Sequence, residues 1–159
     1  MNILARLSIV VVLAVNLWSQ GSASAQGHTE VGTWILDVAQ STFPAGNGPK
    51  SRTLTIKGSA TAVEVSNVTV AANGQSSSSS YSEVFDGREY PQAGSANAIT
   101  TTSRRIDKNT VERITKTAGK VTRTRLRTLS ADGQTLTVNE QGTSGEGQFY
   151  TLTMVLRRQ

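Results

Sequence analysis

The amino-acid sequence predicts an all-β protein, an antiparallel up-and-down meander closed into a barrel of about eight to ten strands. Three observations predict it. Short segments rich in Val, Thr, Ile and aromatic residues alternate apolar and polar positions with a period of two. No segment past the N-terminal region shows the spacing of an amphipathic helix. The connections are short, so successive strands are expected to be antiparallel neighbours.

Nine strands are expected in the chain. They lie near residues 31–37, 51–57, 62–71, 78–85, 98–106, 110–117, 121–129, 135–140 and 148–157. Asn73-Gly74, Asp86-Gly87 and Asp132-Gly133 are dipeptides that favour tight hairpins, because both turn residues adopt positive φ. Two longer connections, residues 38–50 and 88–97, contain all three prolines.

Residues 1–25 have the features of a secretory signal peptide. Arg6 precedes an apolar run over 7–17, and Ala23-Ser24-Ala25 forms a small-x-small cleavage site. A membrane anchor is the alternative, but this run is much shorter than the roughly 20 residues that a spanning helix needs. We therefore expect a single mature domain, residues 26–159, in the periplasm of a bacterium or outside the cell.

The composition excludes several kinds of chemistry. The chain has no cysteine and one histidine, His28, so disulfides, thiolate metal sites and histidine-based triads are not expected. Glu83, Asp86 and Glu89 cluster around one turn, and we interpret them as turn residues. No enzyme activity, cofactor or metal is predicted. Nucleic acid is not an expected partner either, because the basic residues are not interleaved with aromatic ones.

The predicted strand faces favour a barrel over a sandwich. Only 36% of the residues are hydrophobic, and several strands carry Thr, Ser or Arg on both faces. A sandwich needs an apolar inner face on every strand, whereas a barrel with a wet cavity tolerates polar residues inside.

The first and last strands resemble those of the calycin group, which includes lipocalins, avidins and fatty-acid-binding proteins. Gly32-Thr33-Trp34 is similar to the Gly-x-Trp opening of that group, and Arg157 and Arg158 end the last strand. The resemblance implies that Trp34 closes one end of the barrel beneath one of these arginines. The segments 34–43, 85–91 and 130–138 also resemble small secreted bacterial proteins of lipocalin-like type and unassigned role. The segment 38–50 is too rich in Gly and Pro to supply the two-helix lid of fatty-acid-binding proteins.

Two sets of residues are candidates for a binding site. Alternation places apolar residues of the first and last strands on one face, and we expect them to wall a cavity. These residues are Trp34, Leu36, Tyr150, Leu152 and Met154. Arginines on neighbouring strands form the second set, namely Arg113, Arg123, Arg125 and Arg127. Pointing inward, they would bind a carboxylate or phosphate head group. Pointing outward, which we favour because buried arginines are costly to desolvate, they would form a basic surface.

The sequence thus leads to two functional hypotheses. In the first, a monomeric exported barrel binds a small apolar or amphiphilic molecule in its cavity. In the second, the barrel interior is filled and the outer arginine face docks on an anionic envelope surface.

Overall fold

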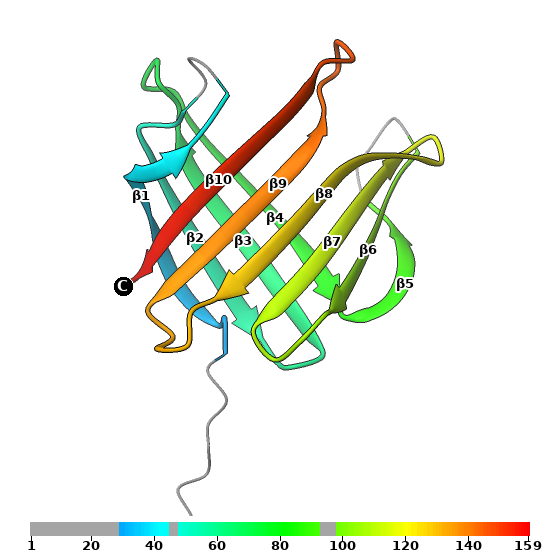
Figure 1. Ribbon diagram of the computed structural model, residues 1–159, viewed down its shortest axis with the longest axis horizontal. Helices are drawn as coiled ribbons and strands as arrows, with labels where there is room; N and C mark the ends of the chain where they lie inside the picture. The colour runs from blue at the N-terminus through cyan, green and yellow to red at the C-terminus, as the bar shows by residue number, and fades with distance from the viewer. Residues whose placement is uncertain (1–28, 45–47, 93–97) are drawn as a thin grey trace, which may run out of the picture.

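The computed structural model describes residues 29–44, 48–92 and 98–159, and the predicted signal peptide lies outside them. One antiparallel sheet contains all ten strands (Figure 1). The strands are β1 (Gly32–Thr42), β2 (Ser51–Gly58), β3 (Ala62–Val70), β4 (Ser76–Val84), β5 (Asp86–Pro91), β6 (Ile99–Arg105), β7 (Thr110–Thr117), β8 (Lys120–Leu129), β9 (Thr135–Thr143) and β10 (Phe149–Arg158). The described residues contain no helix long and apolar enough to cross a membrane.

The strand order β4-β3-β2-β1-β10-β9-β8-β7-β6-β5 is that of a meander whose first and last strands pair. The sheet curls until β4 contacts β6, which brings its two edges together (Figure 1). The edge strands β4 and β5 are not hydrogen-bonded to each other in the described sheet. The predicted all-β antiparallel meander is confirmed, and its barrel is nearly closed, with a gap between β4 and β5.

The structure corrects the prediction around Asp86-Gly87, where no hairpin forms. Asp86 accepts the backbone N–H of Arg88 at 2.9 Å, and Gly87 has a φ of 75°. This geometry makes a bulge at the start of β5, which pairs with β6 instead of β4. A strand therefore occupies part of the region expected to be a long connection.

Hairpins form at Asn73-Gly74 and Asp132-Gly133, but neither is the expected two-residue turn, because only the glycine of each dipeptide has positive φ. Gly74 and Gly133 have positive φ, but each follows a turn within a loop of several residues. The tightest hairpin loop is Ala118-Gly119 between β7 and β8, where both residues have positive φ. This is the geometry of a two-residue hairpin loop.

An apolar core fills one part of the barrel. It is built by the inward faces of β1, β2, β3, β8, β9 and β10, which contribute every second residue. The buried members are Trp34, Leu36, Leu54, Ile56, Val63, Val65, Leu129, Leu136, Val138, Met154 and Leu156. No member comes from β4 to β7, so that side of the interior is lined mainly by other residue types.

Arg158 closes the end of the barrel next to this core. Its guanidinium lies 4.3 Å from the centre of the Trp34 ring, a cation–π contact. It donates to the carbonyls of Thr29, Val31 and Gly133 at 2.9, 2.9 and 2.7 Å. A Cβ at Gly32 would lie 2.6 Å from the same guanidinium, so glycine leaves the room that it needs.

Of the two arginines proposed from the sequence, Arg158 covers the tryptophan. Arg157 points to the outer surface, where it pairs with Asp37 at 3.4 Å. The difference follows from alternation, because neighbouring residues of a strand face opposite sides of the sheet.

We predict that Arg158→Ala lowers the free energy of unfolding by about 3 kcal/mol, because three charge-assisted hydrogen bonds and the ring contact are lost. Urea denaturation measures this change. Arg157→Ala is the matched control, with an expected loss of less than about 1 kcal/mol for an exposed ion pair. Equal losses in the two variants would contradict the closing role of Arg158.

Candidate functional site

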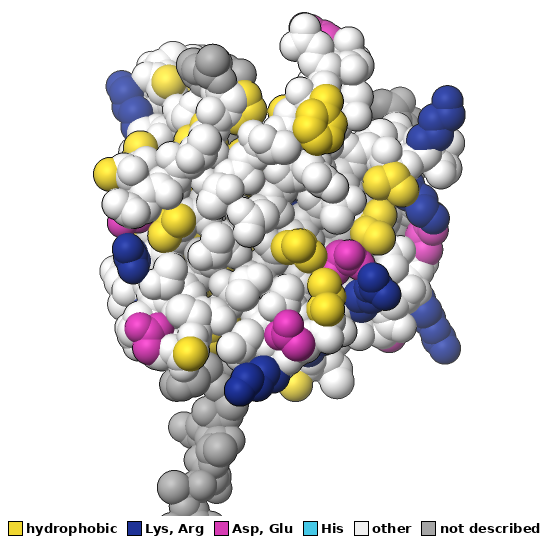
Figure 2. Space-filling view, in the orientation of Figure 1, with side chains coloured by type: hydrophobic (Ala, Val, Ile, Leu, Met, Phe, Trp, Pro, Cys, Tyr) yellow, Lys and Arg dark blue, Asp and Glu magenta, His cyan; other side chains and the backbone are white. Residues whose placement is uncertain are grey.

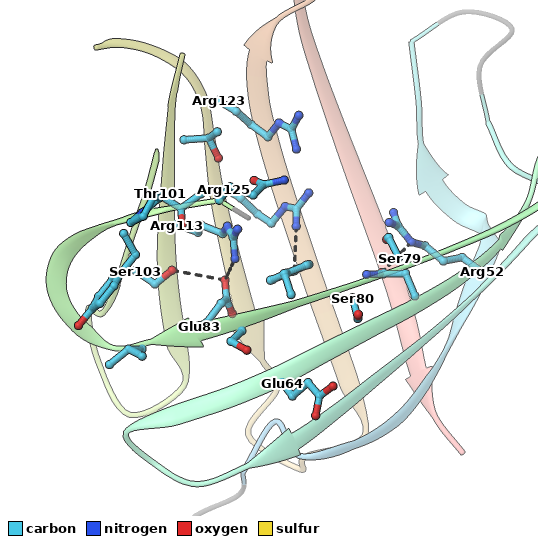
Figure 3. A pocket seen from close by; sticks show the side chains of 18 residues that line it. Arg52, Glu64, Ser79, Ser80, Glu83, Thr101, Ser103, Arg113, Arg123 and Arg125 are labelled. Atoms are coloured by element: carbon cyan, nitrogen blue, oxygen red, sulfur yellow. Dashed lines mark hydrogen bonds and ion pairs between the residues drawn. The ribbon is translucent and has the colours of Figure 1, made fainter. Parts of the chain in front are cut away.

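A cavity of about 630 Å³ lies between β2, β3 and β4 on one side and β6, β7 and β8 on the other (Figure 3). Its walls are mainly polar. The lining residues are Arg52, Glu64, Asn67, Ser79, Ser80, Tyr81, Ser82, Glu83, Val84, Tyr90, Pro91, Gln92, Thr101, Ser103, Arg113, Thr115, Arg123 and Arg125. The volume is within the range of about 300–1,000 Å³ that is typical of small-molecule sites.

The cavity opens at the unpaired edge of β4. Six consecutive residues of this strand, 79–84, line it. Side chains of a strand alternate between the two faces of the sheet, so a cavity that touches all six must extend around the strand edge. Tyr90, Pro91 and Gln92, at the end of β5, line the same cavity. The gap between β4 and β5 is therefore its lateral mouth.

A buried ion-pair network forms the floor of the cavity, with Arg127 of β8 at its centre. Arg127 donates to Glu30 at 2.5 Å and to Glu83 at 2.7 Å. Glu83 also accepts from Arg113 at 3.0 Å and from Ser103 at 3.4 Å. The side chain of Glu83 has no solvent exposure and that of Arg127 is 3% exposed. The charges therefore compensate each other almost entirely out of water.

The ion pairs determine the ionisation of Glu83. Burial alone would raise its pKa, but the charges of Arg127 and Arg113 and their hydrogen bonds lower the pKa below its ordinary value. The carboxylates of Glu83 and Glu30 keep Arg127 protonated, so the pKa of Arg127 is raised despite its burial. The ion pairs thus stabilise the charged forms of both side chains, the carboxylate of Glu83 and the guanidinium of Arg127.

A second cluster surrounds Glu140 of β9. Arg125 donates to one of its oxygens at 2.7 and 2.5 Å, while Tyr150 donates to the other at 2.8 Å. Arg123 lies 3.6 Å from Glu140 at the rim. Burial works against ionisation, yet Arg125 and Arg123 lower the pKa of Glu140. Glycine at position 142 leaves room for Tyr150. A Cβ there would lie only 3.0 Å from the Tyr150 hydroxyl oxygen.

The remaining arginine contacts hold the cavity walls together. Arg113 lies 4.1 Å over the Tyr81 ring, and Arg105 lies 4.5 Å over Phe85. Arg105 also pairs with Glu30 at 3.2 Å. Tyr81 belongs to β4 and Phe85 follows directly after it, whereas Arg105 belongs to β6 and Arg113 to β7. These contacts therefore join the open edge of β4 to the strands on the other side of the gap.

The structure corrects the expectation that the arginine-rich face of β8 points outward. Arg123, Arg125 and Arg127 point into the barrel, with side-chain exposures of 45, 17 and 3%. Arg113 lies inside as well and is 10% exposed. The outer surface over β8 to β10 shows scattered lysines and arginines and no continuous basic stripe (Figure 2). Docking through that strand face is therefore ruled out by its orientation.

The physical reason for the inward orientation is the supply of counter-charges. Glu30, Glu83 and Glu140 meet the guanidinium groups and offset their desolvation, which the sequence analysis did not anticipate. A signal for two of these acids exists in the sequence. Glu140 is in phase with Leu136 and Val138 of its strand, and Glu83 is in phase with Tyr81.

The structure also corrects the expected apolar cavity wall. None of the five residues Trp34, Leu36, Tyr150, Leu152 and Met154 lines the 630 Å³ cavity. Trp34, Leu36 and Met154 are buried in the core, and Leu152 packs against it. The Tyr150 hydroxyl donates a hydrogen bond to Glu140. These side chains pack against β2 and β3, leaving the space on the β4 to β7 side.

Comparison with known proteins relates the chain to a fold. No protein-family model and no curated protein sequence matches it. A crystal structure of a mutant of the fluorescent protein UnaG is similar, with a TM-score of 0.53 at 18% identity over 81% of this chain and 95% of that chain.

Two further solved structures match the chain with lower TM-scores. A Schistosoma mansoni fatty acid binding protein in complex with arachidonic acid has a TM-score of 0.48 at 13% identity, over 84% of this chain and 98% of that chain. A zebrafish ileal bile acid-binding protein complexed with cholic acid has a TM-score of 0.49 at 9% identity, over 81% of this chain and 98% of that chain. The similarity to the UnaG structure shows that the protein shares its β-barrel fold.

We predict that Glu83→Gln lowers the free energy of unfolding at pH 7 by about 3–5 kcal/mol, because Arg127 and Arg113 lose a buried counter-charge. The lowered pKa of Glu83 means that its contribution is complete above its ordinary value of 4.5 and is lost as the pH falls through the lowered one. The difference between wild type and variant should therefore shrink in acid.

Urea denaturation at a series of pH values from 7 to about 3 measures both effects. Glu112→Gln is the control, because its ion pair with Arg104 lies on the outer surface, and we expect it to cost less than about 1 kcal/mol. A stability difference for Glu83→Gln that does not change with pH would disprove the electrostatic explanation.

Proposed function

We propose that the protein is an exported, non-catalytic binding protein that holds a small amphiphilic molecule in its lateral cavity. The observation that carries the proposal is the 630 Å³ cavity, which is open between β4 and β5 inside a nearly closed barrel. Barrels of this size commonly enclose a ligand cavity when side chains do not fill them.

The residues of the cavity wall favour an amphiphilic ligand. Arginines and hydroxyl groups supply hydrogen-bond donors, whereas Tyr81, Val84, Tyr90 and Pro91 supply apolar surface near the mouth. A ligand with a polar end and an apolar end would match both types of surface.

The state of the carboxylates supports a binding role over a catalytic one. General acid–base catalysis works best with a pKa near the operating pH. The pKa values of Glu83 and Glu140 are lowered, and both groups are held by arginines. Among the described residues, no group of three potential metal ligands occurs.

Export remains part of this proposal and rests on residues 1–25. A carrier or sequestering protein in the periplasm or outside the cell would meet amphiphilic molecules released from the envelope.

Native mass spectrometry of residues 26–159, purified from the compartment to which the chain is exported, tests the proposal. We expect a reproducible non-covalent adduct that solvent extraction removes and identifies. A bare polypeptide mass, together with no binding of decanol, decanoate or decyl phosphate in calorimetric titration, would contradict the proposed function.

We further predict that Thr101→Phe reduces the affinity for the bound molecule by at least about tenfold, because Thr101 is buried on the cavity wall and the larger ring occupies ligand space. Calorimetric titration of the extracted ligand measures the change. Thr151→Phe adds the same ring on the exposed face of β10 and should bind like wild type. Wild-type affinity in Thr101→Phe, with the fold intact by circular dichroism, would place the ligand elsewhere.

A further inference from the structure

The interior of the barrel contains more positive than negative charge. Among the described residues, six arginines contribute guanidinium groups to the interior or its rim. They are Arg52, Arg105, Arg113, Arg123, Arg125 and Arg127. The negative charge comes from three buried glutamates, Glu30, Glu83 and Glu140, and from Glu64 on the cavity wall. The arginines therefore outnumber the glutamates in the interior.

Five of the six arginines form ion pairs with these glutamates. Arg127 contacts two acids, Arg113 shares Glu83 and Arg105 shares Glu30. Arg125 and Arg123 share Glu140. Arg52, on β2, is the remaining arginine, and it forms no ion pair within the part of the chain that the structure describes.

The contacts of Arg52 leave most of its donors unused. Its Nε donates to the Asn67 side-chain oxygen at 3.2 Å, and one terminal nitrogen donates to the thioether sulfur of Met154 at 3.2 Å. A guanidinium has five N–H donors, and a thioether sulfur is a weak acceptor. Partial burial and the nearby charge of Arg125 lower the pKa of Arg52. Glu140 acts on Arg52 in the opposite direction from a greater distance, but no described carboxylate forms an ion pair with it.

Arg52 also lies where a cavity ligand would meet it. It projects from the wall opposite Arg113 and Thr101, beside Ser79 (Figure 3). Arg52, Tyr81 and Arg125 line the cavity together, and the same three residues also border a second, much smaller pocket. The Tyr81 hydroxyl accepts from Arg125 at 3.3 Å and donates to no described residue. Three side chains thus present donors around one space.

We propose that Arg52 is the head-group site for an organic acid, so that the bound amphiphile carries a carboxylate or phosphate group between Arg52, Tyr81 and Arg125. This inference rests on the proposed function and adds the chemical class of the ligand. An acidic group there supplies the missing counter-charge and relieves the repulsion between the two arginines. The guanidinium of Arg52 matches the paired oxygens of either acid. The floor arginines are already occupied by Glu30 and Glu83.

The test compares three ligands with the same alkyl chain, namely decanoate, decyl phosphate and decanol, by calorimetric titration at pH 7. Wild type should bind at least one of the acids tenfold or more tightly than decanol. The better acid identifies whether the head group is a carboxylate or a phosphate. Acetate and inorganic phosphate, titrated alongside, show whether the acid binds without a tail. Binding of the free anions as tight as that of the decyl acids would contradict an amphiphilic ligand.

The decisive variant is Arg52→Gln, which retains a donor toward Asn67 and removes the charge. We expect it to lose the tenfold preference for the acid and to bind decanol like wild type. Arg104→Gln, which removes an exposed arginine of the outer face, should keep the full preference. An Arg52→Gln protein that still prefers the acid, or a wild type that binds decanol equally well, would overturn the assignment.

Two readouts keep the outcomes distinct. Thermal unfolding of the ligand-free variant separates a folding defect from a binding defect, and Arg52→Lys restores charge if glutamine destabilises the wall. Preference for the acid should return in part with lysine, because lysine lacks the paired donors of arginine. Tight binding of decanol without acid preference would refute the head-group site alone. Absence of binding by all three ligands would count against the cavity as a binding site altogether.

Discussion

The guanidinium of Arg127 is the interaction on which the rest of the structure depends. It joins Glu30, at the start of the described chain, to Glu83 near the end of β4, and both contacts are out of water. β4 has a hydrogen-bonded neighbour on one side only. On its open side, Glu83 reaches Arg127 of β8, Arg113 of β7 and Ser103 of β6. Side-chain ion pairs therefore hold the barrel together where a ladder of backbone bonds is missing.

This arrangement also divides the interior into two parts. The apolar core fills the space between β1, β2, β3 and β8 to β10, and the ion pairs lie between that core and the polar cavity. Each buried charge requires its partner, because removal of one ion leaves the other desolvated and unpaired. The network thus fixes the position of the cavity floor, whereas a purely apolar filling would tolerate repacking. The chain, with its low hydrophobic content, builds a barrel with a small core in this way.

The sequence predicted the parts of the structure that depend on local order. Period-two alternation and short connections were sufficient for the antiparallel meander, and the Gly-x-Trp opening pointed to Trp34 and a terminal arginine. The orientation of Arg127 was not accessible, because its partners are 97 and 44 residues away in the sequence. The phase of Glu83 with Tyr81 indicates which way its side chain points, but no local pattern shows which arginine it meets after folding. The strand β5 was missed for a related reason, since its pairing depends on a bulge at Gly87 and on β6.

The gap between β4 and β5 has a kinetic consequence. In a barrel closed by a full ring of backbone bonds, a molecule passing through the wall would have to break several ladder bonds at once. Here the two facing strands have no such bonds between them, so passage requires only rearrangement of side chains and small displacements of strand edges. Movements of this kind occur in nanoseconds to microseconds, far faster than sheet opening. For the ligand-binding function proposed above, loading and unloading would then be decoupled from unfolding of the barrel, and the residence time would be set by the strength of the contacts inside.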